Sequence, residues 1–158
     1  MSTELDRLYR GPDPGELPFG GVGTIILDAV CREPAPEVLE RVRSVLSVVA
    51  TKTRSTWPSD TEWQELLPPW FSAKLRVYTQ AESDEIMARR RRKGWFEIPW
   101  DYGSWLDGIK ERVWQWWRAD IDGPYLRIEL ALESWPYSVG ALEYLIKAAG
   151  ARTVSVKE

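Results

Sequence analysis

The sequence predicts an α+β fold, because strand and helix signals alternate at both ends of the chain and a helix-rich segment separates them. Residues 22–31 are nearly all apolar and often β-branched, which is typical of a strand buried on both faces. A helical pattern follows them. Residues 126–132 open a second strand–helix unit. The length of 158 residues suits one domain with a single core.

The first helix is predicted at residues 37–50. Val38, Val42, Val45 and Val49 recur at helical spacing and form one apolar stripe. Prolines precede this stretch at positions 34 and 36, where a helix can begin but not continue. An amphipathic helix therefore follows the first strand and can cover one face of a sheet.

The second unit is predicted from an alternating strand at residues 126–132 and a helix whose apolar positions run from Val139 to Ala149. Gly150 ends that helix, and residues 153–156 alternate as a final strand. Residues 75–79 are the candidate fourth strand. Two such units predict a ferredoxin-like split βαβ sandwich with a Trp-rich helical insertion. A small open α/β sheet is the alternative.

The chain divides into an extension, a core and an insertion within one domain, residues 1–158. Residues 1–21 form the N-terminal extension, with a short helix at 4–9. Residues 22–56 and 124–158 form the sheet–helix core, and 57–123 form the insertion.

Three capping boxes, which begin at Ser59, Thr79 and Ser104, predict three helices in the insertion. The second helix runs to Lys93. The third extends to Trp117.

The composition excludes most catalytic chemistry. There is no histidine and one cysteine, so Ser-His-Asp and Cys-His arrangements, His-ligated zinc and thiolate cages are all impossible. We therefore predict no catalytic residue, no cofactor and no metal, although carboxylate, lysine or tyrosine chemistry stays open. A net charge of −3 and the absence of an apolar leader or a membrane-length apolar run favour a cytoplasmic location without a membrane partner.

Ten tryptophans are the most unusual feature, and nine of them lie between residues 57 and 117. On the predicted third helix, Trp114 points away from the apolar arc and toward Asp107 and Lys110. We therefore expect Trp114 to be exposed, unless residues 57–72 cover it, and Trp100 to be the next exposed tryptophan. Exposed tryptophans are common anchors for a partner protein.

A basic run ends the helix predicted to start at Thr79. Arg89, Arg90, Arg91 and Arg92 precede Lys93. Acidic residues begin the same helix, an arrangement that the helix dipole favours without any partner. The arginines are otherwise candidates for steering toward an acidic protein surface or for gripping nucleic acid.

Acidic residues near the second strand offer a different chemistry. Asp122, Glu129 and Glu133 could serve a Trp-lined pocket for a carbohydrate or another small molecule, or act as hydrolase acids. Asp122-Gly123-Pro124 is also a typical turn.

Non-catalytic protein binding is the leading functional hypothesis, with exposed tryptophans as anchors. In size, acidity and tryptophan content the chain resembles the small immunity proteins with which bacteria neutralise toxins. That resemblance implies a protein partner and assigns no functional residue. A nucleic-acid-associated protein using Arg89–Lys93 is the alternative, and a small-molecule binder or hydrolase is the second alternative. The oligomeric state stays open.

Overall fold

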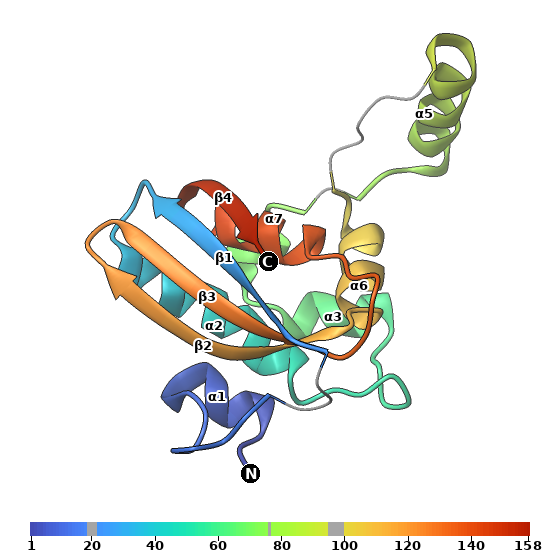
Figure 1. The fold of residues 1–158 in the computed structure, drawn as a ribbon. Helices are drawn as coiled ribbons and strands as arrows, with labels where there is room; N and C mark the ends of the chain where they lie inside the picture. The colour runs from blue at the N-terminus through green and yellow to red at the C-terminus, as the bar shows by residue number, and fades with distance from the viewer. Residues whose placement is uncertain (19–21, 76, 95–99) are drawn as a thin grey trace.

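The computed structural model describes residues 1–18, 22–75, 77–94 and 100–158, and its centre is one antiparallel sheet (Figure 1). The strands are β1 (Thr24–Cys31), β2 (Trp114–Asp122), β3 (Tyr125–Leu132) and β4 (Ala151–Lys157), in the order β2-β3-β1-β4. With one helix after β1 and one between β3 and β4, this order is the predicted ferredoxin-like arrangement. The α+β class is confirmed.

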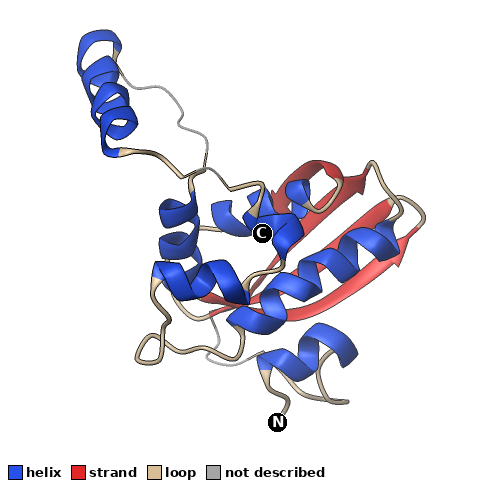
Figure 2. Ribbon diagram, turned by 180° about the vertical axis from the view of Figure 1, so that it is seen from behind, coloured by secondary structure: helices blue, strands red, loops and turns tan. Residues whose placement is uncertain are grey.

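Two helices cover one face of the sheet, α2 (Ala35–Val49) and α7 (Gly140–Ala148) (Figure 2). Along β1 every second residue is buried, beginning with Ile25 and Leu27. The prediction that this strand is buried on both faces is wrong, because no helix of the described ranges lies over the opposite face. That second face is called the open face below.

The fourth strand lies where the sequence predicted a helix. Helix α6 (Tyr102–Lys110) ends early, and the chain then enters β2. The N-cap of α6 is Asp101, whose carboxylate accepts the Ser104 N–H, so Ser104 is not the cap. Residues 77–79 form no strand, and residue 76 lies outside the described residues.

Tryptophan favours pleated, half-buried backbone, and pairing with β3 completes the sheet through β2. Tertiary pairing therefore overrides the helical pattern at this point. The register between β2 and β3 shifts between Trp116 and Arg118, so Trp117 is an additional, bulged residue. Trp116 and Trp117 are both buried as a result.

The rest of the insertion has two parts. Helices α3 (Asp60–Leu66) and α4 (Pro69–Ser72) pack onto the body through the buried Trp63 and Phe71. Helix α5 (Gln80–Lys93) stands apart from the body (Figures 1 and 2). The capping boxes predicted at Ser59 and Thr79 are both confirmed.

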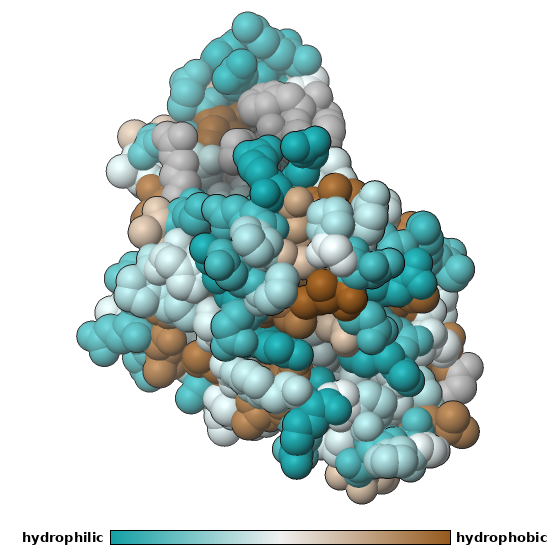
Figure 3. Space-filling model, turned by 90° about the vertical axis from the view of Figure 1, so that its left-hand side faces the viewer, coloured by the Kyte–Doolittle hydropathy of each residue, from teal (hydrophilic) through white to brown (hydrophobic). Residues whose placement is uncertain are grey.

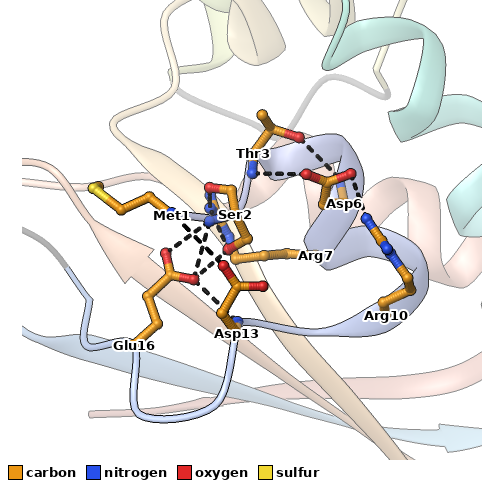
Figure 4. Close-up of polar contacts among 8 residues, drawn as sticks. All are labelled: Met1, Ser2, Thr3, Asp6, Arg7, Arg10, Asp13 and Glu16. Carbon is orange, nitrogen blue, oxygen red and sulfur yellow. Dashed lines mark hydrogen bonds and ion pairs between the residues drawn. The ribbon is translucent and has the colours of Figure 1, made fainter.

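The N-terminal extension folds into α1 (Glu4–Arg10) and a loop that returns to it (Figure 4). The Ser2 hydroxyl donates to Glu16 Oε1 at 2.6 Å, which closes the loop. That hydrogen bond lowers the pKa of Glu16. Arg7 donates to the Ser2 carbonyl at 2.7 Å and so connects the loop closure to α1. The extension is thereby held in place beside β2.

Candidate protein-binding edge

One edge of the sheet, formed by β2, is covered at Trp116 by side chains of α1. The Trp116 N–H donates to Glu4 Oε2 at 2.8 Å, and Arg7 Nε donates to the Trp116 carbonyl at 2.8 Å. Arg7 is only 4% exposed, and its guanidinium lies 5.1 Å from the Trp117 ring. Arg112 holds Glu4 through a 2.8 Å ion pair. The outward N–H and C=O of Trp116 are thus satisfied by a built network of α1 side chains.

The opposite edge, formed by β4, is different, and the hydrogen-bond pattern of β1 shows which of its groups point outward. Cys31 donates to the Pro124 carbonyl, and Leu132 donates to the Gly23 carbonyl, so odd-numbered residues of β1 bond toward β3. Because the backbone direction alternates along a strand, even-numbered residues of β1 bond toward β4.

The residues of β4 paired with those even positions are Thr153, Ser155 and Lys157. The N–H and C=O groups of Val154 and Val156 consequently point away from the sheet. In the parts of the chain that the structure describes, no hydrogen bond engages these groups. We call the outward backbone of Val154 and Val156 the β4 edge.

The side chains along β4 give this edge a chemical character. Val154 and Val156 are partly buried on the helix side, while Thr153 and Ser155 face the open side. The charged residues of the strand, Arg152 and Lys157, are both basic and both exposed. An edge with apolar positions on one side and positive charge suits an extended segment that carries carboxylates.

An aromatic pair lies at the end of β4. Trp135 is 55% exposed, and its ring packs edge-on against Tyr137 with centroids 4.8 Å apart. The Tyr137 hydroxyl donates to Glu158 Oε1 at 2.7 Å, which places the pair beside the residue that follows β4. The same bond raises the pKa of Tyr137. Among the described tryptophans, Trp135 is the one with an exposed ring.

A shallow hollow of about 550 Å³ lies on the open face. Among its lining residues, the Asp28 carboxylate accepts a hydrogen bond from Arg127 Nε at 2.9 Å and forms an ion pair with Lys157 Nζ at 2.9 Å. Hydrogen bonds from Arg127 and Lys157 lower the pKa of Asp28, and Asp28 in turn raises the pKa of Arg127. A carboxylate held ionised between two cations is a structural ion pair and a poor proton donor.

The structure buries Trp114 and partly buries Trp100, the two predicted tryptophan anchors. Trp114 is 1% exposed on β2, with the Arg112 guanidinium 5.4 Å from its ring, so the expectation that it is exposed is wrong. Trp114 is not on the helix that carries Asp107 and Lys110, both of which lie on α6. Trp100 is partly buried and packs beside Gly108 and Gly140.

The arginine run lies on α5, as predicted, with Arg89, Arg90, Arg91 and Arg92 in its C-terminal half. Arg92 forms an exposed ion pair with Glu85 at 3.4 Å. Because α5 stands apart from the sheet, the arginines do not form one surface with β4 (Figure 1). The basic run and the β4 edge are separate features.

The predicted acids do not converge on a Trp-lined pocket. Asp122 lies at the β2–β3 turn and borders the open-face hollow, which confirms the turn. Glu129 is paired with Arg118 at 2.8 Å, and Glu133 accepts a long hydrogen bond from Gln115 at 3.4 Å. Neither glutamate lines the hollow.

Residues 1–18, 22–75, 77–94 and 100–158 contain no group of three or more His, Cys, Asp or Glu side chains placed to hold a metal ion. Cys31 is buried, and burial raises the pKa of its thiol. None of the helices in the described ranges combines the length and the apolar character needed to cross a bilayer.

Sequence reasoning missed the β4 edge and Trp135. The only available signal was that Trp135 stands outside the cluster at residues 57–117. Comparison with protein-family models gives no match, and none of the curated proteins or solved structures compared with the chain matches it.

Proposed function

We propose that the chain is a non-catalytic cytoplasmic protein-binding module that takes an extended, acidic segment of another protein as an added strand along β4. The difference between the two sheet edges carries this proposal. An open strand edge is a template for another chain, and proteins commonly cover such edges. Here Glu4 and Arg7 of α1 engage the outward groups of Trp116 on the β2 edge, while the outward groups of Val154 and Val156 have no partner in the described part of the chain.

Strand addition gives affinity through backbone hydrogen bonds and specificity through alternate side chains. An added strand would bond to Val154 and Val156 and cover their partly buried side chains. Its carboxylates would lie near Arg152 and near Lys157, which also pairs with Asp28. Trp135, exposed at the end of the strand, is the aromatic anchor in place of Trp114.

The test is selection of binders from a displayed library of extended peptides, with Val154→Pro as the counter-selection. Proline removes the N–H of residue 154, which points outward and therefore serves no bond within the sheet. Ala119→Pro is the matched control, because Ala119 occupies an outward-directed position on the opposite edge strand, β2. We expect peptides rich in Asp and Glu that bind the wild type and Ala119→Pro equally and fail to bind Val154→Pro.

Trp135 is tested with the same peptides. Trp135→Ala should weaken them by at least about tenfold, as loss of an aromatic anchor does. Tyr125→Ala, which removes a comparably exposed ring (57%) from β3, should leave affinity unchanged. Peptides that bind Val154→Pro as well as the wild type, or that show no acidic preference, would contradict strand addition at β4.

A further inference from the structure

Helix α5 is a 14-residue helix none of whose residues is buried. It stands away from the body, and the surface at the top of Figure 3, where α5 lies, is mostly hydrophilic. Isolated helices of this length are marginal in water, because a helix gains most of its stability from packing one face. Its capping box and the Glu85–Arg92 ion pair help, but none of its residues is buried, whereas seven residues of the other long helix, α2, are.

The charges of α5 are separated along its axis. Glu82, Asp84 and Glu85 lie in the first half, and the basic run Arg89–Lys93 forms the last part. Met87, close to the centre, is 51% exposed. Two such helices side by side and antiparallel would place the acidic half of each against the basic half of the other, with their dipoles opposed.

We propose that α5 pairs with α5 of a second copy of this chain, antiparallel and with its two-fold axis at Met87. Asp84 and Arg90 are three residues before and after Met87 and share its helix face. Across the axis Asp84 of each copy meets Arg90 of the other, so the same surface of each chain forms both sides of the contact. The two Met87 side chains form the apolar centre of the contact.

A nucleic acid is the competing partner for the basic run. The acidic first half of α5 argues against it, because Glu82, Asp84 and Glu85 would repel a phosphate backbone lying along the helix. A second copy uses both halves. A nucleic acid uses one half only.

The experiment measures self-association of the full chain by sedimentation, for the wild type, Asp84→Arg, Arg90→Asp and an equimolar mixture of the two variants. We expect a wild-type dimer that weakens with salt, and at least about tenfold weaker self-association of each variant alone. The mixture should dimerise again, because both positions are then basic in the Asp84→Arg chain and acidic in the Arg90→Asp chain that faces it. Glu40→Arg, an exposed change on α2, is the matched control and should dimerise like the wild type.

Two variants that had merely lost the helix could not dimerise when mixed. Dimerisation of the mixture therefore distinguishes loss of helix pairing from unfolding of α5. A wild-type chain that stays monomeric at every concentration, or variants whose mixture does not associate, would overturn the proposal. A third contradicting result is salt-sensitive binding to a DNA or RNA oligonucleotide that Arg90→Asp abolishes and Asp84→Arg strengthens, without self-association. Val154→Pro should not alter the dimer, so the β4 edge and α5 are tested separately.

Discussion

Trp114 and Trp135 show how differently two tryptophans of this chain contribute. Trp114 is 1% exposed among the side chains between the sheet and its helices, whereas Trp135 is 55% exposed. We predict that Trp114→Ala lowers the free energy of unfolding by about 3–5 kcal/mol, through lost burial and the cavity left behind. Trp135→Ala should cost less, about 1 kcal/mol, because its half-exposed ring loses the edge-on contact with Tyr137. Urea unfolding followed by circular dichroism measures both, and equal losses would refute the assignment of their environments.

Asp28 gives a prediction about pH. Arg127 and Lys157 lower its pKa below the ordinary value of 3.8, so the folded state binds this proton less readily than the unfolded state. The stabilisation is therefore fully present above the ordinary carboxyl range and is lost as the pH falls through the lowered pKa.

We expect Asp28→Asn to be less stable than the wild type at neutral pH and to approach it as the pH falls through the lowered pKa of Asp28. The measurement is the difference in urea midpoint between the two proteins across that pH range. A difference that stays constant with pH would show that the Asp28 ion pairs do not act through its charge.

Alternation along β4 makes a prediction at the scale of the element. Amide protons of Thr153 and Ser155 bond to β1, while those of Val154 and Val156 point outward. In the free chain, hydrogen exchange resolved by NMR should show slow exchange at 153 and 155 and fast exchange at 154 and 156. Protection of all four in the absence of a partner would mean that the β4 edge is already covered.

Elements with local signals were predictable from the sequence. The capping boxes at Ser59 and Thr79 lie within four residues of chain and were confirmed. Strand β2 could not be predicted in the same way, because Trp114–Asp122 follows a real helix and carries no turn signal before it. Its conformation is decided by pairing with β3, and the local spacing of apolar residues carries no information about that pairing.

The predicted anchors failed for the same reason. A helix period applied to residues 105–117 turned Trp114 outward, whereas a strand period turns it inward with Trp116. The β4 edge could not be predicted either, because the order of the strands decides which strand lies at the edge of the sheet. Strand order depends on contacts between residues far apart in the chain.

At the scale of the whole molecule, α1 joins the N-terminal extension to the sheet. Arg7 reaches the Trp116 carbonyl, the Gln115 side chain and the Ser2 carbonyl at once. We predict that Arg7→Ala lowers the free energy of unfolding by about 2–3 kcal/mol, because the hydrogen bonds that the buried guanidinium donates are lost.

Arg10→Ala on the same helix is the control for Arg7→Ala. Arg10 is exposed and pairs with Asp6, so its loss should cost less than about 0.5 kcal/mol. The apparent molecular mass of Arg7→Ala, measured by light scattering, should also rise with concentration, because the β2 edge is uncovered and can associate. A variant that stays both stable and monodisperse would show that α1 does not seal this edge.

Cys31 makes the chain a reporter of its own opening. It is the single cysteine, it is 8% exposed at the end of β1, and burial raises the pKa of its thiol. A thiol reagent can therefore modify the protein only through states in which β1 separates from its neighbours. The rate of thiol labelling at increasing denaturant then measures how often β1 separates, and the label lies neither on the β4 edge nor on α5.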